Sequence, residues 1–146
     1  MATLASGLDG QRNKTKHNRT MGLDQWAIAH KNVNILGHLT QVRREIACWR
    51  KHNRLQGWAE SVYKRQGGTK EFNCVPVDLT LDDIFTLESA VKCGSLPETK
   101  GFFFGNDSYS DMNHYFEFIY EKDKRFCREA KQLIRDGWEI FYNSWW

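Results

Sequence analysis

The chain has 146 residues, of which 14% are aromatic and 27% are charged, and its formal net charge at pH 7 is +3. This length fits a single domain whose core is large enough to need no disulfide or structural metal. No apolar run reaches the roughly 18 residues of a membrane span, and the N-terminus lacks the pattern of a signal peptide. We therefore expect a cytosolic protein without a membrane partner.

Residues 1–20 carry the whole excess of positive charge. Arg12, Lys14, Lys16 and Arg19 stand there against one acidic residue, whereas the rest of the chain has 17 basic and 17 acidic residues. Because the segment is polar and has few apolar residues, we expect a flexible basic arm, followed by one domain over residues 21–146. Nucleic acid could bind only through these four side chains, and a solvated tail is the simpler interpretation.

The domain begins with a predicted strand from Gly22 to Lys31, in which two sets of residues alternate. Asp24 shares one face of this strand with Trp26 and Ile28. A carboxylate on that face needs a partner, because burying it unpaired costs free energy. Residues 32–40 are expected to form the connection to the next element.

The segment from Gln41 to Gln66 is predicted to be the longest helix, since it contains no proline and only one glycine. Its apolar stripe changes face near His52. The stripe consists first of Val42, Ile46 and Trp49, and then of Leu55, Trp58, Ala59 and Val62 on the opposite side. Three interpretations stay open, namely a polar pocket above the helix, a bend, and a helix covered on both sides.

The middle of the chain contains a short strand and a helix. Phe72 to Val77 is apolar and β-branched, with Pro76 near its end, which predicts an edge strand. Thr80 and Asp83 then have the spacing of a capping box. They begin a helix that Gly94 is expected to end.

Three consecutive phenylalanines lie between Gly101 and Gly105. Neighbouring residues of a strand point to opposite sides, so Phe103 would face away from the other two rings. Either both sides of this segment are covered, or Phe103 is available to stack on a ligand or a partner.

The C-terminal third predicts a helix and a last strand. Residues 111–136 have helical spacing of apolar residues, with a break expected near residues 122–124. Trp138 to Trp146 contains five aromatic residues, which must be packed, and we place this strand beside the first one. The predicted fold class is α+β, a small antiparallel sheet that includes the first and last strands and is packed by one long helix and two further helices.

A set of short motifs extends from Met21 to Trp145. It comprises Gly22-Leu23-Asp24, Glu45 with Trp49-Arg50-Lys51, Asn53 and Trp58, Leu96-Pro97, Gly101-Phe-Phe-Phe-Gly105, Tyr109 and Ser144-Trp145. Together these motifs resemble a family of small uncharacterised proteins of tailed bacteriophages. The resemblance implies a phage origin and a setting in the cytoplasm of the infected bacterial host, but no chemistry. Members are sometimes labelled phosphoglycerate kinase; this chain is too short for a two-lobed kinase and lacks a glycine-rich phosphate loop.

Neither a catalytic motif nor a metal motif is evident. The five histidines lack the spacing of a metal-binding helix, and no serine lies in a nucleophile elbow. Asp107 and Asp111 do not have the register of a calcium loop. The four cysteines, Cys48, Cys74, Cys93 and Cys127, form no Cys-x-x-Cys pair, so we expect reduced and mostly buried thiols. No metal or cofactor is predicted.

The best candidate for a ligand site combines Trp49, Arg50, Asn53, Phe103 and Tyr109. Arginine offers a forked donor for phosphate or carboxylate, asparagine can bind an amide or a base edge, and aromatic rings stack on planar ligands. Asp24 completes the set of candidates. In the structural alternative, Arg50 pairs with Glu45 or Glu98 and Asn53 caps a buried backbone group.

For the function we favour a non-enzymatic phage accessory protein that binds and modulates a host protein, since the chain is small and rich in aromatic residues. Sequestration of a small signalling nucleotide at Trp49, Arg50 and Asn53 is the first alternative. A small hydrolase or transferase is the second, and it is expected if Asp24, Glu45 and Arg50 converge in a cleft and one of the carboxylates is perturbed. A structural component of the virion is the third.

Overall fold

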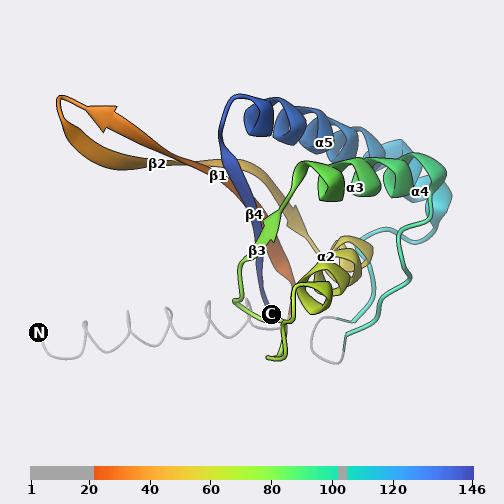
Figure 1. Cartoon of the computed structure of the whole chain (residues 1–146). Helices are drawn as coiled ribbons and strands as arrows, with labels where there is room; N and C mark the ends of the chain where they lie inside the picture. Colours follow the sequence, from red (N-terminus) through yellow and green to blue (C-terminus); the bar gives the residue numbers. More distant parts are fainter. Residues whose placement is uncertain (1–21, 102–104) are drawn as a thin grey trace, which may run out of the picture.

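The computed structural model describes residues 22–101 and 105–146, so the predictions for the basic arm and for Phe103 lie outside the described residues. Its centre is one antiparallel four-stranded sheet with the strand order β2-β1-β4-β3 (Figure 1). The strands are β1 (Asp24–Ile35), β2 (His38–Arg50), β3 (Val77–Leu79) and β4 (Glu139–Trp145). The first and last strands are neighbours, which confirms the predicted α+β fold class.

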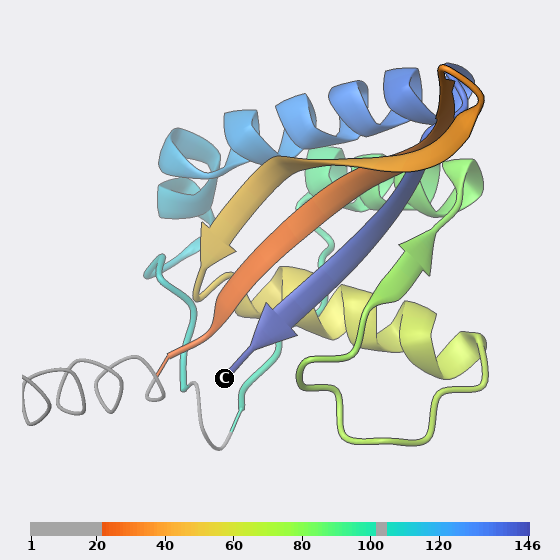
Figure 2. The same ribbon diagram turned by 90° about the vertical axis from the view of Figure 1, so that its left-hand side faces the viewer.

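The helices of the described chain cover one face of the sheet (Figure 2). They are α2 (Asn53–Arg65), α3 (Leu81–Cys93), α4 (Met112–Phe118) and α5 (Tyr120–Arg135). In β1 the side chains of Gln25, Ala27 and Ala29 are buried against the helices, whereas Trp26 and Ile28 are half-buried on the opposite face. The first strand is thus confirmed, but it continues to Ile35, so the prediction that residues 32–40 form a connection is wrong except at the turn. Trp26 and Ile28 lie on the face that these helices leave open.

The predicted helix from Gln41 to Gln66 is wrong over its first half. Residues 38–50 form β2 and pair along their whole length with β1, and only residues from Asn53 onward are helical. A tight turn makes this hairpin, in which Leu36 has φ +51° and Gly37 has φ +83°. The change of apolar face near His52 therefore marks the end of a strand and the start of a helix, joined at Lys51 with φ +52°.

The hairpin of β1 and β2 extends well beyond the rest of the sheet (Figure 1). The pairing of β1 with β4 ends at His30, opposite Glu139, whereas the pairing with β2 continues to the turn. We call residues 32–42 the hairpin extension. Its apolar side chains are solvent-exposed, with exposed fractions of 51% for Ile35, 94% for Leu36 and 77% for Leu39.

The middle of the chain largely follows the prediction. The edge strand is present but lies at Val77–Leu79, directly after Pro76, rather than at Phe72 to Val77. Thr80 and Asp83 form the capping box of α3, and Gly94 ends this helix with φ +65°. These local signals are confirmed because they depend on residues only a few positions apart.

The predicted helix over residues 111–136 is divided at Ile119 rather than near residues 122–124. The Tyr115 hydroxyl donates a 2.7 Å hydrogen bond to Asp123 Oδ2 across this break. Eight residues of continuous helix would separate the two by about 12 Å along the axis. The break is therefore what lets α4 and α5 share a buried polar contact.

Two further expectations concern the thiols and the membrane. Cys48, Cys74 and Cys93 are exposed and only Cys127 is buried, so the prediction of mostly buried thiols is wrong. Cys48 lies on the open side of the sheet, and Cys93 is the last residue of α3. None of the helices in the described part of the chain is long and apolar enough to cross a membrane.

Gly57 allows a loop to pack directly on α2. A Cβ atom at this position would overlap Thr99 Oγ1 and lie 3.0 Å from Thr99 Cβ. Helix propensity alone favours alanine over glycine by about 1 kcal/mol. We expect the opposite for Gly57→Ala, a decrease of about 1–3 kcal/mol in the free energy of unfolding, measured by urea denaturation.

Thr99→Ala provides the control, because it removes Thr99 Oγ1 and Cγ2, two of the three atoms that a Cβ atom at Gly57 would meet. In the Thr99→Ala variant, Gly57→Ala should lower the free energy of unfolding by less than it does in the wild-type protein. A stabilised Gly57→Ala single variant would show that the loop does not pack against α2 in solution.

Candidate functional site

The predicted ligand-binding residues do not form one site. Trp49 is 6% exposed, packs edge-on against Phe126 at 5.1 Å between ring centroids, and belongs to the core. Asn53 is fully buried and donates a 2.6 Å hydrogen bond to the carbonyl of Gly105. The structural alternative for Asn53, a contact with buried backbone, therefore describes its position.

Arg50 and Asp24 lie together on the open face of the sheet. The guanidinium Nη1 lies 2.6 Å from Asp24 Oδ1, so the carboxylate has the partner that the strand pattern required. The two residues line a hollow of about 410 Å³ together with Glu45, Trp49 and Lys122. Asp24, Glu45 and Arg50, the three residues named in the enzyme alternative, thus all line one open hollow.

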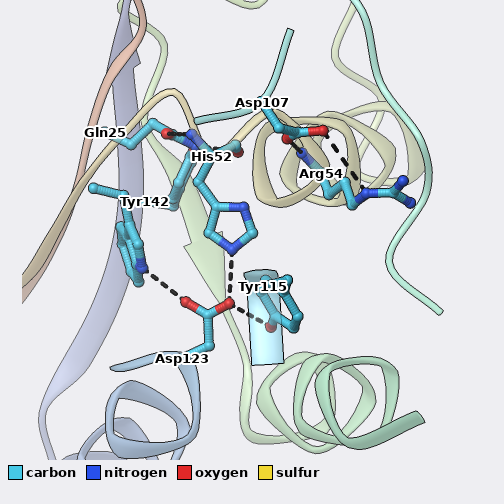
Figure 3. A network of polar contacts seen from close by, with 8 residues as sticks. Gln25, His52, Arg54, Asp107, Tyr115, Asp123 and Tyr142 are labelled. Atoms are coloured by element: carbon cyan, nitrogen blue, oxygen red, sulfur yellow. Dashed lines mark hydrogen bonds and ion pairs between the residues drawn. The ribbon is translucent and has the colours of Figure 1, made fainter. Parts of the chain in front are cut away.

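A buried carboxylate organises the other side of the sheet. Asp123, which is 2% exposed, accepts hydrogen bonds from three side chains (Figure 3). Its Oδ1 lies 2.8 Å from Trp49 Nε1, and its Oδ2 lies 2.7 Å from both His52 Nε2 and the Tyr115 hydroxyl. The Asp123 carboxylate of α5 therefore holds together β2, α4 and the residue that precedes α2.

A second buried network joins β1 to the same junction. Gln25 accepts a 2.9 Å hydrogen bond from the backbone N–H of His52 and donates to the His52 carbonyl and to the Tyr142 hydroxyl. Tyr142 in turn donates to Gln56, whose side chain reaches the carbonyl of Phe72. These polar side chains occupy core positions and are satisfied there, which is the ordinary requirement for buried polar groups.

Tyr109 is the last of the predicted ligand-binding residues that the structure describes, and it does not line the hollow beside Arg50. It is 5% exposed and lines a pocket of about 270 Å³ at the start of α2. Arg54 and Asp107 line the same pocket, and the Arg54 backbone N–H donates a 3.1 Å hydrogen bond to Asp107 Oδ1. Figure 3 shows Arg54 and Asp107 beside the first turn of α2.

Sequence reasoning did not identify Asp123, His52 or Arg54 as members of a site, and it considered Asp107 only as a ligand of a cation. For Asp123 a signal existed, because it continues the buried helical stripe of Phe126, Cys127 and Ala130 at spacings of three, four and seven. An acidic residue in such a stripe requires buried partners. For Arg54 and Asp107 no local signal existed, since their contact joins residues 53 positions apart.

Within the described ranges, no group of three or more histidine, cysteine, aspartate or glutamate side chains could hold a metal ion. Burial and, after it, the Asp123 carboxylate raise the pKa of Tyr115. Burial likewise raises the pKa values of Tyr109 and Tyr142. These three hydroxyls therefore stay protonated in the fold and can donate.

The chain matches no protein-family model, no curated protein and no solved structure. The assignment of either site therefore depends on the geometry and chemistry of its residues.

Replacing the central carboxylate tests its role in the fold. Asp123→Asn keeps the shape but places an amide N–H₂ against groups that already donate. We expect it to lower the free energy of unfolding by about 3 kcal/mol, as measured by urea denaturation. Glu121→Gln makes the same change at an exposed side chain of the same helix and should change stability by less than about 0.5 kcal/mol; equal effects would contradict the role of Asp123.

The buried tyrosines also predict a loss of stability at alkaline pH. In the unfolded chain tyrosines ionise near about pH 10, whereas in the fold the raised pKa values of Tyr109, Tyr115 and Tyr142 keep them neutral. Below that pH the three tyrosines do not reduce the free energy of unfolding. Above it, this free energy decreases by about 1.4 kcal/mol per pH unit for each tyrosine that ionises only in the unfolded chain. Denaturation at a series of pH values measures this slope, and Tyr109→Phe should make it shallower by the share of one tyrosine.

Proposed function

We propose that this protein is a non-enzymatic accessory protein of a tailed bacteriophage that binds a host protein through its hairpin extension. The phage origin and the cytoplasm of the infected host follow from the sequence resemblance. The interaction through the hairpin is supported by one observation above others, the conformation and exposure of Leu36.

Leu36 occupies a position that neither folding nor solubility favours. It has φ +51°, a left-handed conformation that a leucine adopts at a cost, and its side chain is 94% exposed. Asparagine or aspartate before glycine is the usual choice for such a two-residue hairpin turn. A leucine at the outermost point of the hairpin is explained if this side chain is buried in a partner.

The chemistry around Leu36 fits a partner protein with an apolar pocket. Residues 32–42 contain no aspartate, glutamate, lysine or arginine. Each of the three cations at the base of the hairpin has a contact within the protein. Lys31 donates to the carbonyl of Asp136, Arg43 lies over the Phe141 ring, and Arg44 pairs with Glu129. The tip therefore offers Ile35, Leu36 and Leu39 rather than charge, which suits a protein surface better than a phosphate backbone.

The edge of β2 provides a second contact of the same kind. In the strand order β2-β1-β4-β3, β2 pairs only with β1 along its 13 residues. An edge strand of this length can add a strand from a partner through backbone hydrogen bonds. Apolar tip and strand edge lie on one projecting element, so a single partner can contact both.

An enzyme is the second candidate, and the hollow lined by Asp24, Glu45 and Arg50 favours it. This reading gains support if the purified protein consumes a substrate and Glu45→Gln stops the reaction without unfolding the chain. The nucleotide alternative loses its site as first conceived, since Trp49 and Asn53 are buried in separate structural contacts. A role in the virion would require the protein in purified particles.

The variant Leu36→Asn tests whether Leu36 is needed for partner binding without disturbing the fold. Asn-Gly is a preferred sequence for this turn, so we expect unchanged or slightly higher stability together with loss of the partner. The measurement is affinity capture from host lysate, followed by titration of the identified host protein against both purified variants.

Phe118→Asn serves as the matched control, because Phe118 is 62% exposed on α4, away from the hairpin. It should retain the partner. Capture of the same host protein by wild type and by Leu36→Asn with equal affinity would refute the proposal.

A further inference from the structure

The open face of the sheet, which the described helices do not cover, has apolar side chains at its centre (Figure 2). Trp26 and Ile28 on β1 are half-buried on this face, and Phe141 and Trp145 on β4 have exposed fractions of 9% and 37%. β1 and β4 are the two central strands. Large apolar side chains grouped in this way mark a surface to which a further segment can bind.

Acidic side chains flank this apolar centre. Ile28 pairs with Glu45 on β2 and with Phe141 on β4, and Phe141 pairs with Asp78 on β3. Residues paired in this way have their side chains on the same face, so the four form a row across the sheet with an acid at each end. Both acids are exposed, and neither forms an ion pair with another described residue.

The aromatic rings of this face attract cations. The Arg43 guanidinium carbon lies 5.3 Å from the centroid of the Phe141 ring, which is the distance of a cation–π contact. No cation in the described part of the chain lies over the Trp26 or the Trp145 ring. Aromatic rings beside unpaired carboxylates provide two kinds of contact for arginine and lysine. The open face therefore suits a basic segment of extended chain.

The basic arm, residues 1–20, is a segment of this kind within the same chain. It has four basic side chains against one acidic side chain, and the chain enters the described structure beside the open face. A Cβ atom at Gly22 would lie 2.7 Å from Arg50 Nη2, and Arg50 pairs with Asp24, the first residue of β1. The seven residues of β4 are about 23 Å long, whereas 20 extended residues reach about 70 Å. The arm is therefore long enough to cross the face.

We propose that the basic arm binds the open face of the sheet in its own chain. Its cations lie over the Trp26 and Trp145 rings and pair with Glu45 and Asp78. The face and its margin contain one acid more than they contain cations, whereas the arm has a net positive charge. The acids are Asp24, Glu45, Asp78 and Glu139, and the cations are Arg43, Arg50 and Lys122.

Covalent attachment of the arm makes weak contacts sufficient. A tethered segment has an effective concentration in the mM range, so contacts that bind a free peptide only weakly keep a tethered one in place. The arm is too polar to fold alone, and it therefore binds as an extended segment. This inference goes beyond the proposed function, because the hairpin extension projects past the rest of the sheet and stays accessible to the host protein (Figure 1).

Competition between the tethered arm and a free copy of it tests the proposal. A fluorescent peptide of residues 1–20 is titrated against full-length proteins by anisotropy at about 0.1 M salt, at which charges more than about 10 Å apart are largely screened. Wild type is compared with the arm-neutral variant, which carries Arg12→Gln, Lys14→Gln, Lys16→Gln and Arg19→Gln. In the arm-neutral variant, Glu45→Gln and Glu121→Gln then make the same change on the open face and on α5. Sedimentation velocity measures the oligomeric state of each protein.

We expect the peptide to bind the arm-neutral variant saturably and to bind wild type at least about 10-fold more weakly, because the tethered arm competes. Glu45→Gln should weaken peptide binding about 2- to 5-fold, and Glu121→Gln should leave it unchanged. Absence of binding to the arm-neutral variant, equal affinity for wild type, or equal effects of the two glutamine substitutions would overturn the proposal. A wild-type dimer that dissociates when the arm is neutralised would also overturn it, and would place the arm on a second copy.

Discussion

The Asp123 carboxylate is the group on which the described structure depends. It is nearly inaccessible to water, and it accepts hydrogen bonds from Trp49, His52 and Tyr115. Removing one partner of such a buried charge leaves the others unsatisfied, so the three donors and the acceptor act as a unit. The position of the strand-to-helix junction and the break between α4 and α5 both follow from the need to bring these groups together.

The junction between β2 and α2 has buried polar side chains on one side and a solvent-accessible pocket on the other. On its inner side, Gln25 holds the backbone of His52 and Asp123 holds its ring, both through buried hydrogen bonds. On its outer side, the first turn of α2 presents Arg54 to a pocket, with Tyr109 between the pocket and His52.

Among the described residues, helices cover one face of the sheet and leave the other open. The helix-covered face contains the aliphatic and aromatic core. The open face has Trp26 beside the Asp24–Arg50 pair, and the hairpin extension projects beyond both layers. Within the described residues, β2 is a long edge strand that ends near an apolar tip, and such edges can pair with a further strand.

The sequence by itself determined the α+β class, the capping box and left-handed glycine of α3, and the adjacency of the first and last strands. Each of these follows from residues a few positions apart, or from an aromatic terminus that must be packed. Tertiary structure alone decided that residues 41–50 form a strand, because their apolar spacing suited a helix and only pairing with β1 selected the extended form. It also decided which polar side chains are buried. Asp123 meets Trp49 and His52 across 74 and 71 residues, a distance over which no local pattern carries information.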